Sequence, residues 1–265
     1  MKGGRWPLYS LLAFGYAFLY VPVLLLVIYS FNASRLVTVW GGFSTHWYGE
    51  LLSNTQILNA AWLSIRIAAV NASIAVVLGT LAAMALVRYG RFRGRGGFEL
   101  LLTAPLVMPD VIIGLSLLLL FVAMQQMIGW PVGRGFTTIA IAHITFSMAY
   151  ATVVIRARLT QMDLSLEEAA MDLGARPLVV YLRITLPLIA PALLSAWLLA
   201  FTLSLDDLVI ASFVAGPAST TLPMVVYSSV RLGVSPQINA LASLILLFVS
   251  LVVIIAGLAM ARRRA

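Results

Sequence analysis

The sequence lacks most of the residues from which a soluble enzyme or a metalloprotein builds its chemistry. It contains no cysteine, which excludes disulfides and thiolate metal sites. Its two histidines, His46 and His143, lie far apart in the sequence, and neither belongs to a metal-ligand spacing such as HExxH. Charged residues make up only 10% of the chain, whereas a typical soluble domain has about 25%. So little charge does not cover the surface of a water-soluble protein of 265 residues.

Hydrophobic residues take the place of the missing charge. They account for 62% of the chain and gather in runs of about 20 residues, the length of a helix that crosses a bilayer. Runs of this length with few or no charges are typical of transmembrane helices. We therefore expect an all-α membrane protein with a single transmembrane domain, residues 1–265. Its six predicted spans are about 8–30, 60–87, 99–124, 137–155, 191–214 and 238–260.

The basic residues predict the orientation of the chain in its membrane. The net charge of +8 comes from arginines in the short loops between apolar runs, so a nucleic-acid partner is not needed to explain it. With both termini in the cytoplasm, 13 of the 17 basic residues lie on the cytoplasmic side. Arg35, Arg134 and Arg231 then lie outside, and Arg66 lies within the second span. Because cytoplasmic loops carry the excess of positive charge, we predict this orientation, in a bacterial inner membrane.

A more polar segment, residues 156–190, separates the fourth and fifth spans on the predicted cytoplasmic side. Ser165 followed by Glu168 has the spacing of a helix N-cap with a capping box. Gly174 suits the end of that helix, since glycine adopts the left-handed conformation without strain. Pro177 then favours the first turn of a second helix. The segment is predicted to form a helix–turn–helix.

The same segment carries a signature with fixed spacing, EAA-x3-G-x9-I-x-LP. This signature resembles that of the permease subunits of ATP-binding-cassette importers, and it lies before the last two spans, as in that family. The resemblance implies a fold like that of type I importer permeases, in which this segment is the coupling helix that docks into a cleft of the ATPase subunit. It assigns to ATPase coupling Glu167, Glu168, Ala169, Ala170, Asp172, Gly174, Ile184, Leu186 and Pro187.

The residue types suit contact with a soluble partner. The small side chains of Ala169 and Ala170 let a partner surface approach closely. The carboxylates of Glu167, Glu168 and Asp172 offer anionic contacts to it. The alternative is an amphipathic helix that lies at the membrane interface without a partner.

Further stretches resemble the polyamine branch of these permeases, and most of all its putrescine permeases. They are residues 21–34, 36–40, 104–121, 201–217, 220–236 and 238–246. The resemblance implies a second homologous permease subunit, two ATPase subunits and a periplasmic solute-binding protein as partners. It places the docking surface for the binding protein on the loop 31–59 and on the turns near 125–136 and 215–236. This chain has no GxxxxGK[ST] loop for binding ATP. We therefore expect this chain to hold no cofactor, and the partner ATPase subunits to bind and hydrolyse ATP.

Three aspartates fall within the predicted spans. A charged carboxylate at a helix centre costs about 2.5–3.5 kcal/mol, so each should have a partner or a role. Asp110 lies about 17 Å into the third span, and Asp206 and Asp207 lie about 23 Å into the fifth. They are candidates for a path that pairs with the ammonium groups of a cationic solute, although an ion pair with Arg66, or capping at a helix break after Pro109, is the alternative. Aromatic candidates for cation–π contacts on the same path are Trp197, Phe201 and Tyr227.

Other functions have weaker support in the residues. An intramembrane enzyme with His143, Asp110 and Ser116 as a triad has no GxSxG-like elbow to support it. A stand-alone channel or ion-coupled transporter would move solute without an ATPase. Within the importer family, another solute, such as iron(III) or an opine-like compound, stays open as an alternative to a polyamine.

Overall fold

The structure, a computed structural model, describes residues 6–36, 39–90, 92–232 and 235–262. Within these ranges the chain is helical, and its only extended pairing is an isolated antiparallel bridge between Asn32 and Phe43. The predicted fold class, an all-α membrane protein, is confirmed. In chain order the helices are α1 (Trp6–Tyr29), α2 (His46–Ser53), α3 (Thr55–Arg88), α4 (Arg95–Val107), α5 (Asp110–Ile128), α6 (Phe136–Thr160), α7 (Ser165–Asp172), α8 (Pro177–Val180), the π-helix η1 (Tyr181–Thr185), α9 (Leu186–Leu205), α10 (Val209–Val214), α11 (Leu222–Leu232) and α12 (Pro236–Arg262).

Five stretches within the described ranges are long and apolar enough to cross a membrane, judged by length and composition. The helix α12, which contains the sixth predicted span, contributes a shorter apolar stretch, Pro236–Leu251. The five longer stretches are Tyr9–Tyr29, Thr55–Arg88, Asp110–Ile128, Phe136–Thr160 and Pro177–Leu205.

Some residues that support the sequence predictions lie outside the described ranges. They are Lys2, Arg5, Arg91, Arg263 and Arg264 of the orientation argument, with residues 37–38 and 233–234 of the predicted docking loops.

The chain divides into two compact units, each with its own contacts. The central unit comprises residues 60–224, and the terminal unit comprises residues 1–59 and 225–265. The central unit contains the segment with the EAA signature and all three aspartates of the predicted path.

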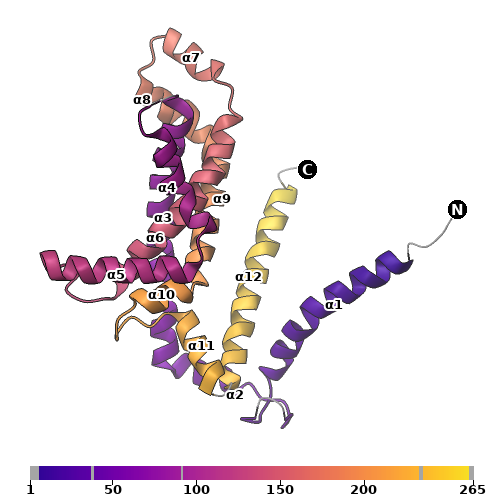
Figure 1. The fold of residues 1–265 in the computed structure, drawn as a ribbon. Helices are drawn as coiled ribbons and strands as arrows, with labels where there is room; N and C mark the ends of the chain where they lie inside the picture. Colours follow the sequence, from indigo (N-terminus) through magenta and orange to yellow (C-terminus); the bar gives the residue numbers. More distant parts are fainter. Residues whose placement is uncertain (1–5, 37–38, 91, 233–234, 263–265) are drawn as a thin grey trace. The chain divides into compact units, whose positions relative to one another are not determined.

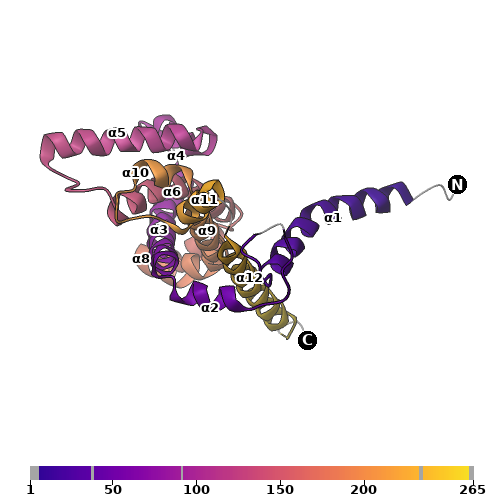
Figure 2. The same ribbon diagram turned by 90° about the horizontal axis from the view of Figure 1, so that it is seen from below.

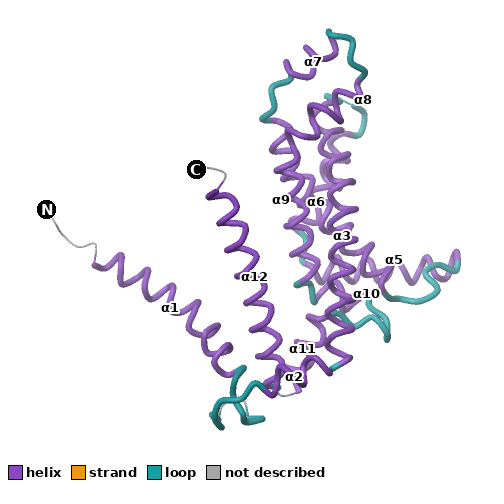
Figure 3. The backbone as a smooth tube through the Cα atoms, turned by 180° about the vertical axis from the view of Figure 1, so that it is seen from behind, coloured by secondary structure: helices purple, strands orange, loops and turns teal. Residues whose placement is uncertain are grey.

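The helices α3, α6 and α9 run side by side in the central unit (Figures 1 and 3). Their shared faces are built from small residues: a Cβ added at Gly79 of α3 would lie 3.0 Å from the Cβ of Ala151 in α6. Lipid tails are as apolar as the side chains, so close packing rather than hydrophobic burial holds such helices together. Fully buried alanines on these faces are Ala72, Ala75, Ala83, Ala151, Ala196 and Ala200.

The predicted third span, 99–124, is not one helix. The chain forms α4 and α5 with a break at Met108 and Pro109, and α5 runs across the direction of α3, α6 and α9 (Figures 1 and 2). Met108 is extended, with φ −81° and ψ 138°, as the residue before a proline prefers. Asp110 is therefore the first residue of α5 rather than a residue in the middle of a helix.

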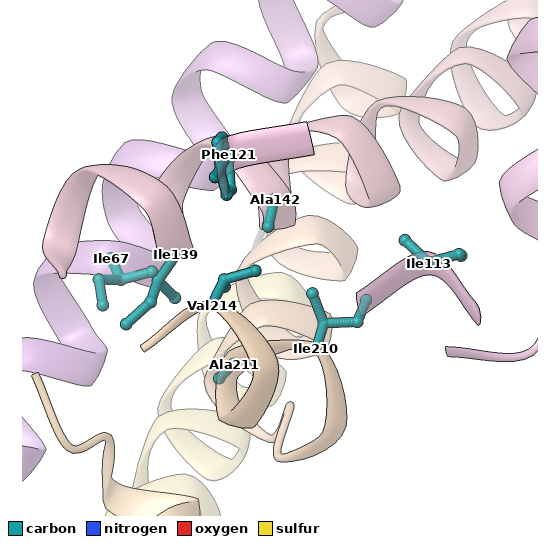
Figure 4. Close-up of a cluster of buried hydrophobic side chains, with 8 residues drawn as sticks. All are labelled: Ile67, Ile113, Phe121, Ile139, Ala142, Ile210, Ala211 and Val214. Carbon is teal, nitrogen blue, oxygen red and sulfur yellow. The ribbon is translucent and has the colours of Figure 1, made fainter. Parts of the chain in front are cut away.

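The predicted fifth span, 191–214, is also two helices. The helix α9 ends at Leu205, and α10 begins at Val209. The side chain of Asp207 accounts for the break, because it binds N–H groups in the first turn of α10. A cluster of buried apolar side chains fixes α10 against its neighbours (Figure 4): Ile67 of α3, Ile113 and Phe121 of α5, Ile139 and Ala142 of α6, and Ile210, Ala211 and Val214 of α10.

The terminal unit is organised by polar contacts around its loop and α2. The side chain of Asn32 donates to the carbonyl of Val39 (2.8 Å) and accepts from the N–H of Gly41 (2.8 Å). The indole of Trp47 donates to the carbonyl of Asn32 at 2.6 Å. The amide of Gln237 donates to Glu50 at 2.7 Å, which lowers the pKa of that carboxyl below its ordinary value. Asn32 is thus joined to α2 through Trp47, and α2 is joined to the start of α12 through Glu50 and Gln237.

Candidate functional site

The helix α7 begins without the predicted capping box. Its N-cap residue is Leu164, which makes no side-chain cap, and Ser165 is the first helical residue. The carboxylate of Asp163 instead accepts the N–H of Ser165 at 3.0 Å, and this bond holds the pKa of Asp163 below its ordinary value. The prediction failed because Asp163, two residues before Ser165, is the stronger local acceptor.

The turn after α7 follows the sequence prediction. Gly174 has φ +87°, a left-handed conformation that costs other residues free energy. Its N–H donates to the carbonyl of Met171 (2.9 Å), and the N–H of Ala175 donates to that of Ala170 (3.1 Å). These two bonds satisfy carbonyls at the end of α7. Pro177 then starts α8, so the predicted helix–turn–helix is confirmed.

The side chains of α7 present a mixed acidic and apolar surface. Glu168, Ala169 and Asp172 are exposed, Ala170 is half-buried, and no residue of this helix is buried. Leu173, just after it, is 90% exposed. Apolar side chains left this open, next to carboxylates, are typical of a surface that a partner covers.

Glu167 differs from the other two carboxylates because it is turned into its own chain. Its Oε1 accepts from Nη2 of Arg88 at 2.8 Å and from the hydroxyl of Thr185 at 2.7 Å. Of its side chain, only 14% is exposed. The direct anionic contact predicted for all three carboxylates thus fits Glu168 and Asp172, whereas Glu167 binds the end of α3 and the end of η1.

The Ile-x-Leu-Pro part of the signature marks the change from η1 to α9. Ile184 lies in the π turn and is half-buried, as is Leu186, and Pro187 is exposed. The N–H of Leu186 donates five residues back to the carbonyl of Tyr181. Pro187 has no N–H for the carbonyl of Arg183, so the signature coincides with an interruption of the normal helical hydrogen bonds.

At the other end of α9, Asp207 holds the start of α10. Its two carboxylate oxygens accept the N–H groups of Ile210 (3.2 Å) and Ala211 (2.7 Å). Nε2 of His143 lies 3.1 Å from Oδ2 of Asp207, and Nδ1 of His143 lies 2.7 Å from the hydroxyl of Ser204. His143 is buried in α6. Asp207 is therefore committed to contacts within its own chain.

His143 is a buried, paired residue to which the sequence reasoning gave no structural role. The sequence signal was its position inside an apolar run, since ionisable residues within membrane spans are costly and generally have a partner. Its partner, Asp207, lies 64 residues further along the chain. Only the packing of α6 against α9 and α10 brings the two side chains together.

Asp206 has the opposite environment from its neighbour. It is exposed, and within the described part of the chain its side chain has no hydrogen bond or ion pair with another residue. On the same helix, the rings of Trp197 and Phe201 stack with centroids 5.2 Å apart. The indole N–H of Trp197 donates to the hydroxyl of Ser73 at 3.2 Å. The half-buried pair is thus fixed on α9, with Phe201 five residues and Trp197 nine residues before the exposed Asp206.

The remaining path candidates are Asp110, on α5 of the central unit, and Tyr227, in the terminal unit. Asp110 is exposed at the start of α5, where a carboxylate is favoured by the helix dipole. Arg66 lies over the ring of Phe136, at 5.2 Å from its centroid, and in the described part of the chain it forms no ion pair with an aspartate. Tyr227 belongs to the terminal unit, where its ring lies under Arg231.

Comparison with known proteins gives matches along nearly the whole chain. The chain is 64% identical over 252 residues to the putrescine transport system permease protein PotI of Escherichia coli (strain K12). This match covers 95% of the present chain and 90% of PotI. It is 42% identical over 247 residues to the spermidine/putrescine transport system permease protein PotC of the same strain, with 93% and 90% covered.

Solved structures of importers share the fold. A bacterial ABC transporter that imports alginate matches with a TM-score of 0.73 and 18% identity, covering 97% of this chain and 96% of that chain. The MetNI methionine ABC transporter in an inward-facing conformation matches with a TM-score of 0.61 and 15% identity, covering 79% and 96%. The family model of the binding-protein-dependent transport system inner membrane component matches residues 75–264. The chain therefore belongs to the family of inner membrane components of binding-protein-dependent transport systems.

Proposed function

We propose that this chain is a permease subunit of an ATP-driven importer that carries putrescine or a related polyamine across a bacterial inner membrane. The observation that carries the proposal is the 64% identity, over 95% of the chain, to a putrescine transport system permease protein. The chain would form half of the membrane path, with a second homologous permease subunit forming the other half. A periplasmic binding protein would deliver the solute to the outer face.

The segment from α7 to the start of α9 is the proposed coupling element. The exposed surface of Glu168, Ala169 and Asp172 is available to an ATPase subunit, and the Gly174 turn holds α7 and α8 in a compact arrangement. ATP binds to and is hydrolysed by two such partner subunits, because this chain lacks a phosphate-binding loop. Both chain termini share the cytoplasmic side with this segment, in agreement with the positive-inside rule.

Asp206 is the proposed contact for an ammonium group in the membrane path. A dication that leaves water needs its charge balanced, and the Asp206 carboxylate has no competing partner within the described chain. The stacked rings of Trp197 and Phe201 offer aromatic faces to the same cation. When the ATPase subunits close on ATP, the permease pair would switch from inward-open to outward-open, so that the solute meets these groups from the outer face.

Uptake measurements test the substrate. Cells that lack this gene and any second polyamine importer receive labelled putrescine, spermidine or an uncharged solute, with and without the gene restored. The proposal predicts that the restored gene raises putrescine uptake and leaves the uncharged solute unchanged. Equal putrescine uptake in both strains would overturn the assignment of a polyamine substrate.

A further inference from the structure

An ion pair joins two segments that are distant in the sequence. Arg88 is the last residue of α3, and Glu167 lies in the first turn of α7, 79 residues later. The Glu167 oxygen that binds Arg88 also accepts the hydroxyl of Thr185, the last residue of η1. We call Arg88, Glu167 and Thr185 the latch.

The latch is shielded although it lies beside an exposed helix. The side chains of Arg88 and Glu167 are 17% and 14% exposed, and Thr185 is 2% exposed. Water screens such a pair less than a surface ion pair, and removal of one partner leaves the other charge partly buried and unpaired. The geometry therefore favours one fixed position of Glu167 over the many that a surface glutamate adopts.

The latch is the side-chain connection between α7 and the helices of the central unit. In the described part of the chain, no α7 side chain other than Glu167 forms a hydrogen bond or ion pair with another helix. Neighbouring Glu168 is exposed. The two consecutive glutamates therefore have different contacts: Glu168 is available to a partner, and Glu167 binds α3 and η1.

We infer that the latch transmits movement of α7 to α3 and α9, with Glu167 as a positioning residue for transport. This inference rests on the proposed function, in which an ATPase subunit moves α7. Thr185 is followed directly by α9, whose far end is capped by Asp206, about 30 Å away at 1.5 Å per residue. A displacement of α7 therefore reaches the start of a helix whose far end is next to Asp206, the proposed path residue.

The test is a charge exchange measured with two readouts in the assembled transporter. Arg88→Glu and Glu167→Arg are made singly and together, and putrescine uptake and ATP hydrolysis are measured in the same membrane vesicles. Each single variant should lower the solute moved per ATP hydrolysed by at least about fivefold, the lower end of typical coupling effects. The double variant should move at least half as much solute per ATP hydrolysed as the unaltered transporter. The reversed ion pair can form in it, and the Thr185 hydroxyl can accept a hydrogen bond from the new arginine.

A matched control is Arg93→Glu, an exposed arginine five residues after Arg88. This variant makes the same charge change as Arg88→Glu and leaves the latch residues unaltered. The solute that it moves per ATP hydrolysed should equal that of the unaltered transporter. A double variant no better than the singles would overturn the inference, as would singles that lose uptake and ATP hydrolysis in equal proportion with the complex intact.

A chemical cross-link separates this inference from the substrate assignment. The chain has no cysteine, so Arg88→Cys with Glu167→Cys introduces the only thiol pair. A short reducible dithiol cross-linker should join the pair within one chain and restore solute-stimulated ATP hydrolysis, which a reducing agent should then abolish. If no cross-link forms, the latch geometry is wrong. If the unaltered transporter takes up no putrescine, the proposed substrate is wrong, and the cross-link still tests the latch.

Discussion

Asp206 and Asp207 are adjacent in the sequence, yet they have different environments at the α9–α10 break. Asp207 accepts two backbone N–H groups and lies against His143, whereas Asp206 is exposed and unpaired in the described chain. Asp206→Asn keeps the size of the side chain and removes its charge. We expect putrescine uptake to fall at least about tenfold with the assembled complex unchanged, since about 1.4 kcal/mol of lost cation attraction is a factor of ten. Uptake kinetics with membrane abundance measure it, and normal uptake would contradict a path role for Asp206.

The pair of His143 and Asp207 should affect stability rather than solute contact. His143→Ala leaves a buried cavity and removes one of the two partners of Asp207 Oδ2, which should lower the free energy of unfolding by about 2–4 kcal/mol. Thermal unfolding of the purified protein in detergent measures this change. The control is His46→Ala in α2. The His46 side chain is 63% exposed, pairs with nearby Glu50 and contacts the ring of Trp47, so the melting temperature of this variant should change little. Equal effects at both positions would contradict a special role for His143.

At the scale of an element, the contact of α3 with α6 depends on the absence of a side chain at Gly79. A Cβ there would lie 3.0 Å from both the Cβ of Ala151 and the N–H nitrogen of Thr152, so Gly79→Ala forces the two helices apart. We expect a loss of about 1–3 kcal/mol in stability, as for other overpacked contacts. Gly15→Ala in α1 makes the same change where no atom lies within 4 Å, and unfolding experiments should show no loss for that variant.

Sequence patterns predicted the long elements and missed their interruptions. Hydropathy located α3, α6 and α12 to within a few residues of their ends in most cases, because a bilayer demands long apolar helices. Hydropathy placed the breaks at Pro109 and Asp207 inside single spans, since each break depends on one residue inside an apolar run. Only the break after Pro109 was foreseen, as an alternative interpretation of Asp110. In the site, Gly174 and Pro177 predicted the turn because their backbone preferences are local. The binding of Glu167 to Arg88 could not be predicted from the sequence, because it depends on the packing of segments 79 residues apart.

At the scale of the whole molecule, the orientation can be tested with two equally exposed positions. Val132, before α6, and Leu173, after α7, are each 90% exposed, and the chain has no cysteine to interfere. A membrane-impermeant maleimide should label Val132→Cys in intact cells whose outer membrane is permeable. It should label Leu173→Cys only after the inner membrane is opened. The reverse pattern would place α7 on the periplasmic side and contradict the orientation predicted from the arginines.

The π turn η1 also fixes the angular phase between two helices. It contains one residue more than an α turn needs, and each residue added to a helix rotates the rest of that helix by about 100°. Deleting one residue within Tyr181–Thr185 would remove the π turn and leave the helix content nearly unchanged, with Pro187 still lacking its N–H. The α7 segment would then be rotated by about a quarter turn against α9. The circular dichroism spectrum should hardly change, whereas transport should stop. The extra residue of η1 thus acts as a spacer: without it, the helices on both sides still form, but they no longer have the right rotation relative to each other.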